Sequence, residues 1–211
     1  MIHHVIWDFD GTLFDTYPAM ARAFREALAD ISSPDLPTIP EILVPLKIIM
    51  DEAYRVFVTE KGLSMDEARA AYKRRSPKAE AEIAFPFAAA KQLCMDIVAA
   101  GGKNYIFTHR NTSTLAMLEK FGMLDLFEEI VTSENGYARK PAPDAINYLM
   151  EKYAMDPADA IMIGDRELDV LSGFNAGIRT CLLAESVDTP SCASAVVTGF
   201  SAMYPVIGLA E

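Results

Sequence analysis

Cysteine is scarce in this chain and poorly placed for cross-links. The 211 residues contain only three cysteines, Cys94, Cys181 and Cys192, which are widely spaced and odd in number. This pattern gives no disulfide framework and no zinc-binding motif. Cys94 and Cys181 lie in apolar runs, so we expect both to be buried thiols. The reducing cytoplasm is the expected compartment.

Basic residues are also few relative to acidic ones. The chain has 19 Lys and Arg against 30 Asp and Glu, which gives a formal net charge of −11. This charge argues against a nucleic-acid surface, although a local lysine and a metal ion can reverse the field in a cleft that binds an anion. No uncharged apolar run is long enough to cross a membrane. We therefore expect neither a nucleic acid nor a membrane as partner, and nothing in the sequence indicates an obligate protein partner.

The N-terminal part of the chain combines one strand pattern with a long helical region. Residues 2–9 have the pattern of a short buried strand. The region 15–85 has no strand pattern and is helical in pattern as far as Arg75, apart from a proline-rich loop expected over 32–40. Asp15 or Thr16 can cap its first helix, and Ser64 with Glu67 forms a capping pattern at a later helix start.

After residue 86 the pattern changes to alternating helices and strands. Strands are expected over 104–107, 129–132, 160–163, 179–183 and 195–198. Strands separated by helices favour a parallel, doubly wound sheet with right-handed crossovers. We predict an α/β core domain formed by residues 1–14 and 86–211, with an all-helical domain, residues 15–85, inserted after the first strand.

Two carboxylates lie at the end of the first strand. Asp8 and Asp10 are spaced i and i+2, which points both side chains the same way in extended backbone. Two anions so close repel, and each raises the pKa of the other. A shared divalent cation would remove the conflict. The alternative is that one carboxyl group stays protonated and acts as an acid, and both alternatives indicate a functional site.

Further reactive side chains follow the other strands. Thr108 follows the strand 104–107, Lys140 lies in the loop after 129–132, and Asp165 and Asp169 follow 160–163. Because ligands bind at the carboxyl ends of strands in such sheets, we expect these groups to converge. Carboxylates, a hydroxyl and an ammonium fit phosphoryl transfer, in which a carboxylate attacks phosphorus and cations stabilise the transferring group.

The motifs around these residues resemble those of the haloacid dehalogenase-like (HAD) hydrolase superfamily. The similarity covers nearly the whole chain and is closest to the phosphoglycolate phosphatase-like branch, which has a helical C1-type cap. It is carried by four motifs in the expected order: Asp8-Phe9-Asp10-Gly11-Thr12-Leu13, Phe107-Thr108, Lys140-Pro141 and Gly164-Asp165-Arg166-Glu167-Leu168-Asp169. The resemblance implies a Rossmann-like core with a helical cap formed by the insertion.

The resemblance also implies roles for individual residues. Asp8 would be the nucleophile and Asp10 the general acid and base. Mg²⁺ would be held by Asp8, the backbone carbonyl of Asp10, Asp165 and Asp169, the last directly or through water. The phosphoryl group would bind Thr108 and Lys140, with Thr12 and His109 as further candidates. We therefore expect a Mg²⁺-dependent phosphatase that acts on a small phosphorylated metabolite, similar to phosphoglycolate or a sugar phosphate.

Three other interpretations stay open. A phosphomutase of the same superfamily is disfavoured because Met20 occupies the position where the hexose-phosphate mutases of this branch carry histidine. A phosphorylation-dependent receiver also combines an aspartate, a metal site, a threonine and a lysine, but it would lack a helical insertion. A non-catalytic phosphate-binding relative would keep the fold without turnover. His109, which follows Thr108, departs from the small residue or asparagine of many relatives.

Overall fold

The computed structural model describes residues 1–31 and 35–210. It divides into two compact units, one formed by Met1–Leu13 with Pro86–Glu211 and the other by Phe14–Phe85. The first part of the expected proline-rich loop, residues 32–34, lies outside the described residues. In the part of the chain that is described, no helix combines the length and apolar character needed to cross a membrane.

The first unit is built on a six-stranded sheet in which every adjacent pair of strands is parallel. The strand order is β5-β4-β1-β6-β7-β8. The strands are β1 (His4–Trp7), β4 (Lys103–Phe107), β5 (Phe127–Val131), β6 (Ala160–Gly164), β7 (Arg179–Leu183) and β8 (Ala195–Val197). This confirms the predicted doubly wound α/β fold. The strand order reverses at β1, so the carboxyl ends of β1, β4 and β6 meet at the switch point where such sheets bind ligands.

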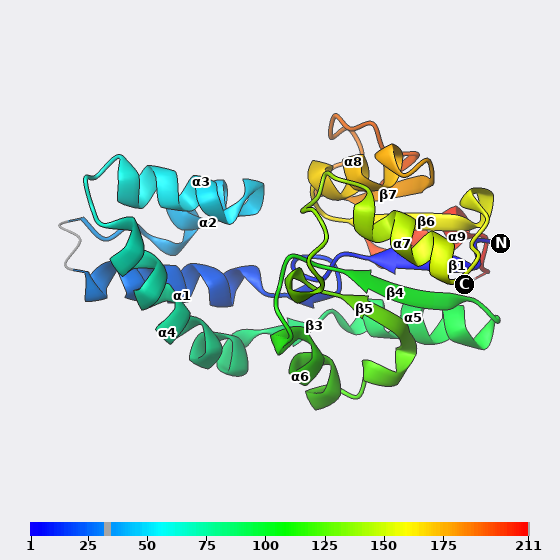
Figure 1. Cartoon of the computed structure of the whole chain (residues 1–211), viewed down its shortest axis with the longest axis horizontal. Helices are drawn as coiled ribbons and strands as arrows, with labels where there is room; N and C mark the ends of the chain where they lie inside the picture. The colour runs from blue at the N-terminus through cyan, green and yellow to red at the C-terminus, as the bar shows by residue number, and fades with distance from the viewer. Residues whose placement is uncertain (32–34, 211) are drawn as a thin grey trace. The chain divides into compact units, whose positions relative to one another are not determined.

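Helices cover both faces of this sheet (Figure 1). They are α5 (Ala88–Ala99), α6 (Ser113–Lys120), α7 (Asp144–Lys152), α8 (Glu167–Asn175) and α9 (Met203–Ile207). On one face, Ile146 and Leu149 of α7 pack in one buried cluster with Ile6 and Met162 of the sheet. Because successive side chains of a strand point to opposite faces of the sheet, the residues next to these in each strand face the other side.

A buried asparagine ties the second face of the sheet to α5. Asn104 accepts a hydrogen bond from the indole N–H of Trp7 at 2.9 Å and donates to the carbonyl of Cys94 on α5 at 2.9 Å. Cys94 and Cys181 are buried and Cys192 is exposed, and all three are free thiols, as expected. The two chain ends lie on the same side of this unit (Figure 1), where the Ile2 N–H donates to the Ile207 carbonyl.

The second unit consists mainly of helices. They are α1 (Tyr17–Asp30), α2 (Ile39–Ile48), α3 (Met50–Tyr54), a π-helical turn (Arg55–Thr59) and α4 (Met65–Ile83). Its core contains an aromatic group in which the Phe24 and Tyr54 rings lie 5.2 Å apart, with Tyr72 6.3 Å from Phe24. Two short strands, β2 (Phe14–Asp15) and β3 (Phe85–Pro86), form a separate two-stranded sheet.

Local details of the helical unit differ from expectation at three points. Thr16 is the residue before α1, but its side chain makes no capping hydrogen bond. Helix α2 begins at Ile39, so Pro40 lies in its first turn, where a missing N–H costs nothing. Helix α4 continues through Pro77 to Ile83. The expected cap is confirmed at Ser64, whose hydroxyl accepts from the Glu67 N–H.

Candidate active site

Asp8 is placed at the switch point by backbone pairing that continues past the end of β1. Its N–H donates to the carbonyl of Ile163 on β6 at 2.8 Å, and its side chain is 1% exposed. A carboxylate so deeply buried needs a compensating charge, because removal from water disfavours its ionised form.

Lys140 supplies that charge and links two carboxylates. Its Nζ donates to Asp8 Oδ1 at 2.6 Å and to Asp169 Oδ1 at 2.7 Å, and its side chain is completely buried. The ammonium also lies 4.8 Å from the centre of the Phe107 ring, a favourable cation–π distance. Breaking such a buried pair leaves an uncompensated charge, so the loop that carries Lys140 is tied firmly to the sheet.

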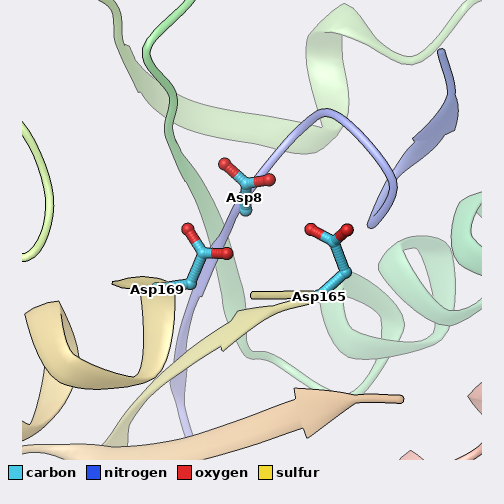
Figure 2. Close-up of side chains that lie close together, drawn as sticks. All are labelled: Asp8, Asp165 and Asp169. Atoms are coloured by element: carbon cyan, nitrogen blue, oxygen red, sulfur yellow. The ribbon is translucent and has the colours of Figure 1, made fainter. Parts of the chain in front are cut away.

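Three carboxylates form an acidic cluster beside this pair. One oxygen each of Asp8, Asp165 and Asp169 lies within 4.8 Å of the others, and Figure 2 shows the three groups converging from the end of β1, the end of β6 and the start of α8. Asp8 Oδ2 is buried and accepts no hydrogen bond within the described residues. An oxygen-rich cluster with an unused buried acceptor fits a Mg²⁺ ion.

Arg166 is a cation that the sequence interpretation left without a role. Its guanidinium lies 3.8 Å from Asp8 Oδ2, from Asp165 Oδ1 and from Asp169 Oδ2. Its position directly after Asp165 indicates that its backbone lies near the cluster, but not where its guanidinium points. Three carboxylates therefore face two cations, Lys140 and Arg166, and the negative excess favours a bound cation.

The two carboxylates that share Lys140 differ in protonation tendency. Burial disfavours ionisation of Asp8, but the Lys140 ammonium and then the Arg166 guanidinium outweigh it and lower the pKa of Asp8. Burial and the neighbouring Asp8 raise the pKa of Asp169. Of this pair, Asp8 is the one held as an anion, which is the form a nucleophile requires.

Gly164 makes room for Asp169. A Cβ at position 164 would lie 2.3 Å from Asp169 Cβ and 2.6 Å from its Oδ2. The Asp169 carboxylate thus passes directly over the backbone at the end of β6, and its Oδ2 also accepts from the Arg166 N–H at 3.1 Å. This close approach explains a glycine before Asp165.

Asp10 lies outside the acidic cluster. Its carboxylate Oδ1 instead accepts from Arg110 NH1 at 3.0 Å. The expectation that Asp10 offers the metal a backbone carbonyl is compatible with this side-chain position. Arg110 was not assigned a role from the sequence, and its place two residues after Thr108 is the only signal for it.

The expected phosphate-binding residues are divided between two environments. Thr108 is buried, and its Oγ1 accepts from the Arg110 N–H at 3.1 Å. Thr12 is buried, and its hydroxyl donates to Asp165 Oδ1 at 3.4 Å. Thr12 therefore contacts the acidic cluster, whereas Thr108 belongs to the turn after β4.

His109 contacts the lysine loop. Its Nε2 accepts from the Lys140 backbone N–H at 2.8 Å, and Arg139 NH2 lies 3.2 Å from its Nδ1. Burial, with Lys140 and Arg139 nearby, lowers the pKa of His109 to about 3. The imidazole is therefore neutral at physiological pH, and it fixes the backbone that presents the Lys140 side chain.

The family model of the haloacid dehalogenase-like hydrolases matches residues 5–183, a span that contains every site residue described above. The chain belongs to this family. Proteins similar to this chain include a phosphoglycolate phosphatase of Vibrio vulnificus, which is 26% identical over 82% of this chain and 79% of its own length. They also include the pyrophosphatase PpaX of Bacillus velezensis, which is 26% identical over 87% of this chain and 83% of its own length.

Two solved structures have a similar fold. A hydrolase from Streptococcus pneumoniae TIGR4 is 29% identical and covers 99% of both chains with a TM-score of 0.68. A predicted phosphoglycolate phosphatase from Haemophilus somnus 129pt is 20% identical, covers 97% of both chains and reaches a TM-score of 0.82. The second similarity is evidence for the fold alone.

Proposed function

We propose that this hydrolase is a Mg²⁺-dependent phosphatase that acts on a small phosphorylated metabolite through an aspartyl-phosphate intermediate. The observation that carries the proposal is the environment of Asp8. It is a buried carboxylate held as an anion by Lys140, with one oxygen that accepts no hydrogen bond from the described residues and an acidic cluster beside it. This combination provides a nucleophile, a charge to neutralise the phosphoryl group and ligands for a metal.

In the first half of the reaction Asp8 attacks phosphorus. A bond forms between an Asp8 carboxylate oxygen and phosphorus, and the bond from phosphorus to the leaving oxygen breaks. Asp10, in its protonated form, gives its proton to that oxygen, so the product leaves as an alcohol. Lys140 stabilises the negative charge, and its link to Asp169 keeps the ammonium in place.

In the second half the intermediate is hydrolysed. Asp10, now a carboxylate, takes a proton from water, and the water oxygen attacks phosphorus. The bond between Asp8 and phosphorus breaks, which releases inorganic phosphate and restores the Asp8 carboxylate and the protonated Asp10. Each group returns to its starting state, so the cycle balances.

The acidic cluster would hold the metal ion. Asp8, Asp165 and Asp169 offer carboxylate oxygens, and the resemblance adds the backbone carbonyl of Asp10. When bound, Mg²⁺ would supply positive charge to the transferring phosphoryl oxygens. Thr12 would orient Asp165 through its hydroxyl.

The substrate class comes from the relatives and stays a proposal. Phosphoglycolate phosphatases and a pyrophosphatase are among the similar proteins, and a small anionic phosphate compound suits this site once a bound Mg²⁺ offsets the excess of carboxylates. We propose the cytoplasm as the compartment, in accord with three free cysteines. The helical unit as a cap that selects the substrate also stays a prediction.

A phosphate-release assay tests the proposed function. The purified protein is incubated with phosphoglycolate, pyrophosphate, sugar phosphates and p-nitrophenyl phosphate, with Mg²⁺ or with EDTA. We expect release from at least one substrate, loss of release in EDTA, and loss in Asp8→Asn. No release from any substrate, or equal release by Asp8→Asn, would overturn the proposal, and transfer of phosphate within a sugar phosphate without release would indicate a phosphomutase.

A further inference from the structure

Arg110 and Asp10 form an ion pair beside the reacting groups. Arg110 NH1 donates to Asp10 Oδ1 at 3.0 Å, and the two side chains are only 10% and 15% exposed. Pairs at the surface contribute little because solvent screens them and their side chains move. This pair is largely shielded and joins the ends of β1 and β4, so it can fix a side chain.

The guanidinium is itself held from several directions. Its NH2 donates to Ser113 Oγ at 3.2 Å, and the group lies 5.5 Å from the centre of the Phe9 ring. The backbone of Arg110 is tied at both polar groups, since its N–H donates to Thr108 Oγ1 and its carbonyl accepts from the Ser133 N–H at 2.8 Å. Arg110 is therefore a rigid donor.

A rigid donor beside Asp10 has a specific consequence for the proposed chemistry. Asp10 lies two residues from Asp8, close to a cluster that attracts cations. A carboxylate that is free to rotate would be drawn to a bound metal ion and could no longer exchange a proton with substrate and water. A guanidinium donates hydrogen bonds and accepts none, so it can hold Asp10 by Oδ1 whether the other carboxyl oxygen carries a proton or not.

We propose that Arg110 is a positioning residue that holds the Asp10 carboxyl group in the orientation for proton transfer and away from the acidic cluster. The inference rests on the proposed function, because it assumes that Asp10 is the general acid and base. Arg110 itself forms and breaks no covalent bond. It acts through Asp10 in both half-reactions, first when the leaving oxygen is protonated and then when water is deprotonated.

The dependence on the leaving group tests this role. A poor leaving group, such as the alkoxide of an alkyl phosphate, requires a proton, whereas p-nitrophenolate leaves without one. The variants are Arg110→Met and Arg110→Lys, and the control is Arg179→Met, which removes the same charge from an exposed position at the start of β7. For each protein, kcat and kcat/KM are measured with p-nitrophenyl phosphate and with the alkyl phosphate that is hydrolysed fastest in the phosphate-release assay.

We expect the two substrates to respond differently. General acid catalysis contributes about 10²- to 10⁴-fold, so a mispositioned acid should lower kcat/KM for the alkyl phosphate by about 10- to 100-fold in Arg110→Met. For p-nitrophenyl phosphate, kcat/KM should stay nearly unchanged, because its first step needs no proton. Its kcat should fall, and a burst of p-nitrophenol should appear, because hydrolysis of the aspartyl phosphate still needs Asp10 as a base. For Arg110→Lys, kcat/KM with the alkyl phosphate and kcat with p-nitrophenyl phosphate should lie between those of Arg110→Met and the wild type.

Other outcomes would overturn the inference. A rise in KM for both substrates without a burst would mean that Arg110 binds substrate directly. An equal fall in kcat/KM for both substrates would indicate a general structural role. If Arg110→Met does not fold, Ser113→Ala supplies the test, because it removes one hydrogen-bond acceptor of the guanidinium. We expect a smaller loss of kcat/KM that is confined to the alkyl phosphate. An equal loss of kcat/KM for both substrates would refute the positioning role.

Asp10→Asn separates this inference from the proposed function. If Asp10→Asn shows the burst and the selective loss but Arg110→Met does not, the positioning role fails and the phosphatase mechanism stands. If Asp10→Asn itself affects both substrates equally, the acid and base assignment fails, and with it the basis of the inference.

Discussion

The close approach of Asp169 to Gly164 gives a quantitative prediction. A methyl group at position 164 would lie 2.3 Å, 2.5 Å and 2.6 Å from Cβ, Cγ and Oδ2 of Asp169. These separations are far below van der Waals contact, and the obstructing atoms include Cβ, which a change of rotamer cannot move. In Gly164→Ala, the first turn of α8 must therefore shift away from the end of β6, and the Asp169 carboxylate must shift with it.

Two costs add to give the expected loss of stability. Overfilling a packed core costs about 1–3 kcal/mol. Displacing Asp169 also weakens its 2.7 Å hydrogen bond from Lys140, and a hydrogen bond to a charged group contributes about 1.5–3 kcal/mol. We expect the free energy of unfolding of Gly164→Ala to fall by about 3–5 kcal/mol.

Urea unfolding followed by tryptophan fluorescence measures this loss. The chain has a single tryptophan, Trp7, which is completely buried on β1, so it reports on the unit that contains the site. The matched control is Gly199→Ala, because position 199 has extended backbone and a methyl group there would meet no described atom within 4 Å; its stability should change by less than about 0.5 kcal/mol. Equal unfolding midpoints for the two variants would refute the packing argument.

Three further predictions concern charges of the site. Lys140→Met leaves Asp8 and Asp169 without their shared ammonium and should cost about 3–5 kcal/mol of unfolding free energy in urea. Asp165→Asn should weaken Mg²⁺ binding by about tenfold or more in calorimetry while the Trp7 unfolding midpoint stays near the wild type. His109 has its pKa lowered to about 3, so the unfolded chain binds its proton first as the pH falls from about 6.5. Wild-type stability should then drop by up to about 1.4 kcal/mol per pH unit relative to His109→Gln between about pH 6.5 and 3. An unchanged unfolding midpoint in Lys140→Met would contradict the buried ion pair, and an unchanged Mg²⁺ affinity in Asp165→Asn would contradict the metal ligand. Parallel pH profiles of stability for the wild type and His109→Gln would contradict the lowered pKa of His109.

The regular part of the fold was predictable because its signals are local. Strand β7 (Arg179–Leu183) has the predicted bounds, since an apolar run and turn residues mark its ends. The continuation of α4 through Pro77 was not predictable, because proline normally ends a helix and the packing of α4 against α1 is not visible in the local sequence pattern. Helix α9 (Met203–Ile207) is too short for a periodic pattern.

The candidate site was predictable to the extent that strand order determines it. Asp8, Lys140 and Asp165 follow strands that topology brings together, so their convergence could be expected from the sequence. The partners of Asp10 could not, because the pair with Arg110 depends on how two loops fold and on side-chain rotamers. The same holds for Arg166, whose sequence position gives no direction for its guanidinium.

Chemical capture of the aspartyl-phosphate intermediate tests most directly whether Asp8 is the nucleophile. The protein is mixed with p-nitrophenyl phosphate and Mg²⁺, quenched during turnover and treated with borohydride, which reduces an aspartyl phosphate to homoserine; peptide mass mapping then locates the change. We expect homoserine at position 8 and at no other aspartate. Phosphate release without any homoserine at position 8, or homoserine at another position, would contradict Asp8 as the nucleophile.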